Sequence, residues 1–481
     1  MAPSVEEHAE RRARAALWAL FGIALAQRLW NLVKVQPLTG FDAPGHMGYV
    51  LTILREHRLP HPTEGWSTFH PPLYYLVASV VWGILEPLGS RAVLYGIRSI
   101  GVVLGFAMAL VTHRLVRQLG GSREVAFVAT ALVLFVPCIQ MSATMEGNEA
   151  FAAGIGALGL PSLLALQADP RNVRAALITG AFAALAAISK FTGLALIAAC
   201  AIPFLRRDLD RAMLRAALAL GFVFAVIAGP IYARNVVVAG SPFPMTRTHE
   251  PMASAERVQV IRPRQVNDYF TLHADNFLRP SVFQLARLPA SYRNRNRAMT
   301  SVPGLLYASF WYDPFAHRIP INYHRDGIRS GPTMMVLGLL PTLVMLVGLV
   351  AATWESVTRR LRAPSAPLVA MAFAGTGMLA LHTWTAQSTA SVKGTYLLQL
   401  APIAAVFFAQ GAMMLRGRAR IVALALSLAA VAAAAFVFTE GMLFWSAPPG
   451  VAAWVAWARQ LPGSHIEEAI RWLIPTILIV R

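Results

Sequence analysis

Lysine and cysteine are scarce in this chain of 481 residues. The two cysteines, Cys138 and Cys200, both stand inside apolar runs, which disfavours a disulfide framework and favours two buried thiols. Lysine occurs only at Lys34, Lys190 and Lys393, so arginine supplies most of the formal charge of +19. The arginines occupy short segments between apolar runs instead of one basic soluble face, so we expect no nucleic-acid partner.

Charged residues are also few, at 14% of the chain, whereas 56% is hydrophobic and the mean hydropathy is +0.54. This composition excludes a soluble enzyme and predicts an all-α polytopic membrane protein. No repeat of fixed period and no low-complexity linker is present. Apolar runs that could cross a bilayer stand near Ala15–Val33, Val93–Thr112, Val125–Met141, Ala150–Leu166, Ala175–Ile188, Thr192–Leu205, Leu214–Val238, Met334–Thr353, Ala366–His382, Leu397–Leu415 and Ile421–Phe438.

The charges predict how the chain threads the membrane. Met1–Arg14 is polar and basic, and no small-residue cleavage site follows the first apolar run, so we expect a retained signal anchor with a cytoplasmic N-terminus. The basic segments all become cytoplasmic only if Pro71–Gly89 is not a full span. That segment starts with two prolines and ends at Glu86-Pro87, which favours an interfacial or re-entrant element. The basic segments are Arg114–Arg123, Arg171–Arg174, Arg206–Arg215, Arg359–Arg362 and Arg416–Arg420.

This threading leaves a set of polar segments on the outer face. We expect one membrane domain over residues 1–440, with large external loops at 38–75 and 240–331. The second loop is too long for a connector and predicts a lid or binding loop. The last segment, 441–481, fits interfacial helices and one more hairpin equally well. The other outer segments are Ser142–Glu149, the turn at Lys190 and Gln387–Thr395.

Asp42 is the strongest candidate for chemistry. It precedes Pro44 at the start of a short predicted helix, on which His46 and Tyr49 share its face at i+4 and i+7. Two roles, which are compatible, fit this position. The first is a helix N-cap, and the second is a general base at the membrane surface with an imidazole nearby.

A group of motifs gives the chain a family resemblance. Asp42, His46 and Tyr49, followed by His70-Pro71-Pro72-Leu73-Tyr74-Tyr75, resemble the first external loop of the membrane-embedded GT-C glycosyltransferases, in particular the protein O-mannosyltransferase and aminoarabinose-transferase branch. The likeness covers most of Ala15 to Leu415. Weaker matches are Lys190-Phe191-Thr192-Gly193, Arg234-Asn235 with Gly240-Ser241-Pro242, and Lys393-Gly394-Thr395-Tyr396.

The resemblance implies a GT-C-like bundle of about 11–13 transmembrane helices. It further implies inverting transfer of a sugar from a polyprenyl-phosphate donor to a hydroxyl of a glycan, lipid or protein. The protein would lie in the cytoplasmic (plasma) membrane with its active site on the external face. Asp42 matches the catalytic acidic residue of the family. Two departures are Ala43, where many relatives carry Glu, and Thr395, where Arg is common, which leaves Lys393 as the phosphate partner.

The residue types suit this chemistry. A carboxylate can take the proton of the acceptor hydroxyl, and fixed cations can stabilise the departing lipid phosphate. Lys190, Arg234 and Lys393 stand at predicted outer helix ends, where snorkelling to the headgroups is the alternative role. The expected substrate-binding residues are His46, Tyr49, Glu146, Asn148, Lys190, Arg234, Lys393 and Tyr396.

A second acidic group and a metal are further expectations. One of Glu146, Asn148 and Glu149 is expected beside Asp42, either as a metal ligand or as an acceptor-binding group, and solvated carboxylates are the alternative. His46, His61 and His70 with Glu64 form a possible site for a divalent metal, and their irregular spacing is unlike a closed structural zinc site. We expect His70 to be the best ligand, because its motif neighbours fix it, with Glu64 as a further ligand. No nucleotide or redox cofactor is expected.

A different class of function also fits a polytopic chain. A transporter or flippase of lipid-linked sugars usually shows internal repeats and charged or broken helices near the bilayer midplane. This sequence has no repeats, and its ionisable residues gather at one predicted face. The glycosyltransferase is therefore the preferred hypothesis.

Overall fold

The computed structural model describes residues 5–35, 37, 42–205, 209–244, 263–280, 297–312, 325–386, 391–440 and 459–479. All regular secondary structure within these ranges is helical, as the sequence predicts. Parts of the predicted external segments, namely residues 245–262, 281–296, 313–324 and 387–390, lie outside the described ranges.

Eight helical stretches in the described part of the chain are long and apolar enough to cross a bilayer. They are α1 (Val5–Lys34), α4 (Ser90–Gln118), α7 (Asn148–Ala168), α10 (Arg211–Ala239), α15 (Arg325–Leu337) with α16 (Leu339–Thr358), α17 (Ala366–Thr385), η8 (Gly394–Leu400) with α18 (Ala401–Met414), and α19 (Gly417–Glu440). Shorter apolar helices complete the bundle: α3 (Leu73–Leu85), α5 (Arg123–Phe135), α6 (Pro137–Ser142), α8 (Val173–Ala187) and α9 (Ala195–Ala201).

Two predicted spans are not continuous helices. Val125–Met141 divides into α5 and α6 at Pro137, because proline has no N–H to donate and its ring disfavours a helical residue before it. Thr192–Leu205 divides into the 3₁₀ turns η2 (Phe191–Leu194) and η3 (Ile202–Phe204) with α9 between them. In both places a proline or a tight turn overrides an apolar composition that suits a longer helix.

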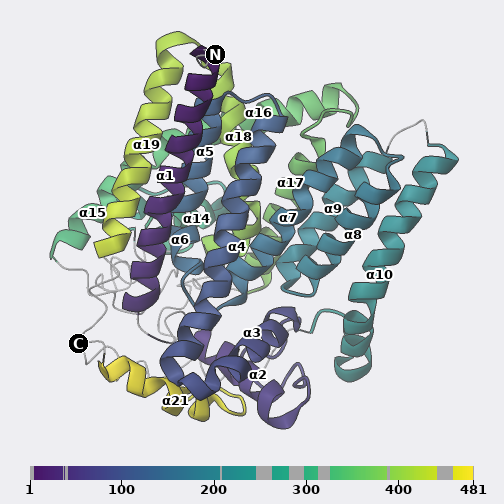
Figure 1. Ribbon diagram of the computed structural model, residues 1–481, viewed down its shortest axis with the longest axis vertical. Coiled ribbons are helices and arrows are strands. Elements are labelled where there is room, and N and C mark those ends of the chain that lie inside the picture. Colours follow the sequence, from purple (N-terminus) through teal and green to yellow (C-terminus); the bar gives the residue numbers. More distant parts are fainter. Residues whose placement is uncertain are drawn as a thin grey trace.

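The short helix α3 does not reach across a membrane. Its 13 residues span roughly 20 Å, less than the ~30 Å hydrocarbon core. It lies with α2 (Ala43–Glu56) and α21 (Ile466–Ile479) at the end of the bundle opposite the N-terminus (Figure 1). The loops that join α4 to α5 and α18 to α19 lie at the N-terminal end, which agrees with α3 not counting as a span.

The closest helix pair of the core is α16 with α18. A Cβ atom on Gly348 would lie 1.8 Å from the carbonyl oxygen of Phe407, and one on Gly411 would lie 2.0 Å from that of Val344. Only glycine allows this approach, so the two backbones touch directly, as small residues permit between membrane helices.

The predicted loop 240–331 is partly helical. It contains η5 (Val266–Tyr269), α11 (Ala274–Leu278), η6 (Arg297–Met299) and α14 (Val302–Trp311). Trp311 at the end of α14 is 5% exposed and donates its indole N–H to Thr342 Oγ1 at 3.0 Å. This part of the segment therefore belongs to the main hydrophobic core.

Candidate active site

The polar side chains that the sequence singles out come together near α2 and α3, two helices at one end of the bundle (Figure 1). They come from α2, from the loop 57–72, from the first turn of α7, from the turn before η2 and from the start of η8. Segments far apart in the sequence therefore build one site.

Asp42, His46 and Glu149 form its centre. One oxygen or nitrogen of each side chain lies within 4.8 Å of those of the other two. The main-chain oxygen of Asp42 accepts from His46 N at 2.8 Å and starts α2, but its carboxylate caps no backbone N–H. It accepts instead from Trp66 Nε1 at 2.8 Å. The carboxylate is thus directed at the site and not at the helix end.

His46 lies beside both carboxylates. It is 2% exposed, and its Nδ1 lies 2.8 Å from the hydroxyl of Tyr75. Burial lowers the pKa of His46, and the nearby carboxylates of Glu149 and Asp42 offset part of this effect. The imidazole is therefore neutral near pH 7. Tyr75 also stacks on Tyr49 with 3.8 Å between ring centroids, so these tyrosines form one wall of the site.

Two buried lysines lie against the acidic centre. Lys190 is 4% exposed and Lys393 5%. The Nζ of Lys190 donates to Asn148 Oδ1 at 2.9 Å and to Glu149 Oε1 at 2.8 Å. The Nζ atoms of both lysines lie 5.6 Å from the ring centroid of Tyr396. Two buried ammonium groups beside the same aromatic ring are suited to hold an anion.

Glu146 does not join this group. Its Oε1 accepts from Arg98 Nε at 2.9 Å, and neither side chain is exposed. Arg98 Nη1 also donates to the carbonyl oxygens of Leu32 and Val35 at 2.9 and 2.7 Å. Arg98 of α4 therefore joins the end of α1 to the segment before α7 through Glu146, and the second acid at the centre is Glu149.

Glu64 and Arg234 lie beside the site and stabilise its loop. Glu64 accepts two hydrogen bonds, at 2.9 and 3.0 Å, from the guanidinium of Arg58. Arg234 Nη2 donates to the carbonyl oxygens of Leu59 and Pro60 at 3.1 and 2.8 Å. Both side chains thus fix the loop 57–72 between α2 and α3.

The donor set at the centre fits a divalent cation. Among the described residues, Asp42, His46 and Glu149 are the group close enough to share one. Two carboxylates and a neutral imidazole suit Zn²⁺ or Mn²⁺, although Lys190 already binds one oxygen of Glu149. The ring of His70 lies 5.7 Å from that of His46, centroid to centroid, and is not part of this group.

Two central side chains were not expected from the sequence. Tyr75 belongs to the His-Pro-Pro-Leu-Tyr-Tyr motif, so the motif itself was the available signal. Trp66 lies in a loop without periodicity, and nothing near it in the sequence indicates a contact with Asp42.

The stability of this end of the molecule should depend on pH through His70. Burial and the neighbouring Lys190, His46 and Lys393 hold the pKa of His70 well below its usual value. As pH falls below ~6.5, the unfolded chain binds a proton that the folded protein does not, so stability is lost with falling pH. We expect the unfolding midpoint to drop less between pH 7.5 and 5.5 in His70→Asn than in the wild type. His61→Asn in the same loop is the control, and equal drops in all three proteins would contradict the assignment.

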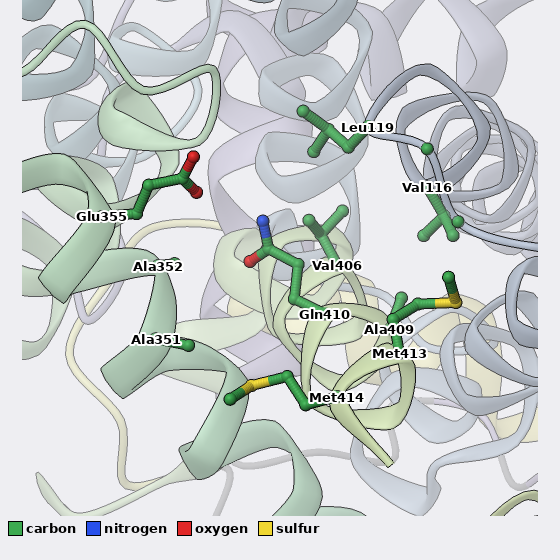
Figure 2. Close-up of a pocket in the computed structure, with 12 residues that line it drawn as sticks. Val116, Leu119, Ala351, Ala352, Glu355, Val406, Ala409, Gln410, Met413 and Met414 are labelled. Carbon is green, nitrogen blue, oxygen red and sulfur yellow. The ribbon is translucent and has the colours of Figure 1, made fainter. Parts of the chain in front are cut away.

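A cavity of about 240 Å³ lies beside the loop that joins α4 to α5, and Figure 2 shows the side chains that line it. Its walls come from α4, α16 and α18, and Glu355 is the sole ionisable residue among those that line it. Glu355 pairs with Arg359 at 3.2 Å. The lining residues are Val116, Leu119, Gly120, Gly121, Ala351, Ala352, Glu355, Val406, Ala409, Gln410, Met413 and Met414. This cavity lacks the paired acids and bases of the site around Asp42.

Comparison with known proteins identifies solved structures with a similar fold. No model of a protein family matches the sequence, and a search of curated proteins found no match. Among solved structures, the oligosaccharyltransferase of Archaeoglobus fulgidus with a tethered acceptor peptide matches with a TM-score of 0.53 and 13% identity. The match covers 95% of this chain and 59% of that one, so this chain spans well under two thirds of its length.

A second structure of the same oligosaccharyltransferase gives a similar match. The same oligosaccharyltransferase with an inhibitory peptide and dolichol phosphate has a TM-score of 0.50 and 12% identity, over 90% of this chain and 59% of that one. ArnT of Cupriavidus metallidurans gives 0.40 and 17%, over 83% and 78%, and a TM-score of this size does not by itself indicate a shared fold. The all-α GT-C-like fold expected from the sequence is confirmed.

Proposed function

We propose that this protein is an inverting glycosyltransferase that moves a sugar from a polyprenyl-phosphate donor to an acceptor hydroxyl. The observation that supports this most directly is the arrangement of Asp42 and Glu149 beside the buried cations Lys190 and Lys393. The similar oligosaccharyltransferase was solved with an acceptor peptide and with dolichol phosphate, which are ligands of the expected kinds.

The proposed step begins at the acceptor. One oxygen of Asp42 accepts from Trp66, and the other takes the proton of the acceptor hydroxyl. The acceptor oxygen forms a bond to the anomeric carbon from the face opposite the phosphate. The bond between that carbon and the phosphate oxygen breaks, and its electron pair stays on the phosphate. The configuration at the anomeric carbon is therefore inverted.

Lys190 and Lys393 are proposed to stabilise the phosphate as its charge develops. Fixed positive charges that water does not screen are most effective there. The ring of Tyr396 lies 5.6 Å from the Nζ of each lysine and contributes a cation–π contact to both. A divalent cation held by Asp42, His46 and Glu149 would supply further positive charge toward the same phosphate.

We place the site on the external face of the cytoplasmic membrane, with the N-terminus inside. The N-terminus and the site lie at opposite ends of the bundle, and the Arg-rich loop 416–420 lies with the N-terminus (Figure 1). Reporter fusions after Glu56 and after Arg420 should report outside and inside, respectively. A cytoplasmic reading after Glu56 would exclude an external lipid-phosphate donor.

The direct test is transfer by purified protein in lipid nanodiscs with a panel of polyprenyl-phosphate sugars and hydroxyl acceptors. We expect Lys393→Ala to weaken binding of undecaprenyl phosphate about 10-fold or more, the effect of losing one charge-assisted hydrogen bond. Lys34→Ala is the matched control, because Lys34 lies at the end of α1 over Trp30. Equal effects of the two substitutions would argue against a phosphate role for Lys393.

A further inference from the structure

The orientation of the Asp42 carboxylate is determined from outside its own helix. Asp42 lies directly before α2, and Trp66 of the following loop donates its indole N–H to Asp42 Oδ1 at 2.8 Å. A rigid indole that binds one carboxylate oxygen restricts rotation of the carboxylate group and leaves the second oxygen free to accept a proton.

Trp66 is itself held by the C-terminal part of the chain. Its main-chain N–H donates to the carbonyl oxygen of Pro462 at 2.8 Å. Gly65 and Gly463 meet at this contact, because a Cβ on Gly65 would lie 3.2 Å from Gly463 Cα. Gly463 has a φ of +145°, a conformation that favours glycine. The backbone here is therefore built for close contact between the loop and the C-terminal segment.

The C-terminal segment is fixed on α2 by polar contacts. The hydroxyls of Ser464 and Thr52 lie 3.0 Å apart, and His465 Nε2 lies 2.9 Å from Glu56 Oε1. Arg55 donates to Glu468 at 3.0 Å. A continuous series of contacts thus runs from α2 through the segment 459–479 to Trp66.

The same segment also joins the apolar core at this end of the bundle. Ile466 is 3% exposed, and a Cβ on Gly48 of α2 would lie 2.9 Å from its Cγ1 atom. Trp472 lies against Trp82 with 5.3 Å between ring centroids. Burial of these side chains holds the segment in place more strongly than its exposed ion pairs, which contribute little.

We propose that Trp66 is a positioning residue that directs the Asp42 carboxylate toward the acceptor hydroxyl, and that the segment 459–479 holds Trp66 in the required place. The proposal rests on the proposed function, since it names what aligns the base of that reaction. Catalysis tolerates only ~0.5 Å of misplacement of such a group, so a carboxylate that rotates freely would be a poorer base.

The test compares two tryptophans of the same end of the bundle. Trp66→Phe keeps a ring and removes the N–H, so kcat should fall about 10- to 100-fold while KM for the donor stays within about 2-fold. Trp82→Phe is the control, because the phenylalanine ring can still pack on Trp472 and keep the segment in place, and the N–H that it removes is not the one that binds Asp42. Its kcat should stay within about 2-fold of the wild type. Equal losses in both variants, or a change in KM alone, would overturn the proposal.

A second readout needs no turnover. The indole N–H resonance of Trp66, assigned by its absence from Trp66→Phe, should shift in Asp42→Asn and stay in place in Glu64→Gln. An unchanged resonance in Asp42→Asn would overturn the contact. A wild-type protein that transfers no sugar from any polyprenyl-phosphate donor would refute the proposed function and leave the Trp66–Asp42 contact standing, whereas an inactive Asp42→Asn beside a fully active Trp66→Phe would refute only the positioning role.

A separate variant tests whether the segment 459–479 holds Trp66 in place. Gly463→Ala strains the backbone at a positive φ, so it should lower kcat with an unchanged donor KM, as Trp66→Phe does. Gly377→Ala is the control, since no atom lies within 4 Å of a Cβ placed there. Normal kcat in Gly463→Ala would show that the segment does not align the base.

Discussion

Replacing Asp42 with asparagine is expected to lower sugar transfer at least about 1,000-fold, the upper part of the range for losing a general base. The amide has nearly the same shape, and its oxygen can still accept from Trp66, so the protein should remain folded in the membrane. The measurement is the initial rate of sugar transfer at saturating donor and acceptor, with the unfolding midpoint taken on the same sample.

Glu64→Gln is the matched control for this substitution. Glu64 is an acidic residue of the same external segment, but its carboxylate is bound by Arg58. The rate of this variant should stay within about 3-fold of the wild type, because the glutamine amide has nearly the same shape and can still accept a hydrogen bond from Arg58, which keeps the loop in place. Near-normal transfer by Asp42→Asn would remove Asp42 from the mechanism.

Replacing Arg98 with methionine is expected to cost about 3–5 kcal/mol of unfolding free energy. Neither Arg98 nor Glu146 is exposed, so the substitution leaves a carboxylate without its cation in the interior. It also removes the donor that binds the carbonyl oxygens of Leu32 and Val35 at the end of α1. Denaturant-induced unfolding in mild detergent, with helical circular dichroism as the signal, measures the loss.

Two comparisons make this second prediction specific. The double variant Arg98→Met/Glu146→Leu removes both charges and should recover much of the lost stability. Arg55→Met breaks an ion pair of 2.7 Å with Glu86, whose partners are 35% and 31% exposed, and should cost less than about 1 kcal/mol. Equal losses for Arg98→Met and Arg55→Met would mean that burial does not determine the energy of the pair.

Hydropathy and charge predict the architecture well because the bilayer imposes a simple length rule on apolar helices. The prediction that Pro71–Gly89 is not a full span agrees with the short helix α3, and the basic loops that follow α4 and α18 accordingly lie at the same end as the N-terminus. The breaks inside Val125–Met141 and Thr192–Leu205 were not predicted, because composition alone does not indicate whether a proline ends a helix or only bends it.

For the candidate site, too, the sequence predicts some features and not others. The i+4 spacing correctly put His46 next to Asp42, since Asp42 directly precedes the helix that carries His46. Choosing between Glu146 and Glu149 required the start of α7, which begins at Asn148 and directs Glu149 to the centre while Glu146 meets Arg98. Such a choice depends on packing between segments and leaves no pattern in the sequence.

Contacts between distant segments were the least accessible to prediction. The loop around Trp66 meets Pro462, and Arg234 binds the carbonyl oxygens of Leu59 and Pro60. Main-chain groups supply one side of each contact, so the residue type at that side carries no signal. The roles of Arg234 as a loop anchor and Trp66 as a neighbour of Asp42 therefore emerge only from the folded structure.

The direct backbone contact between α16 and α18 has a consequence for ligand recognition. The turn η8, which carries Lys393 and Tyr396, runs without interruption into α18, and α18 is fixed on α16 at Gly348 and Gly411. Little conformational entropy remains to be lost there when an anion arrives, so an incoming headgroup meets a binding element that is already in place.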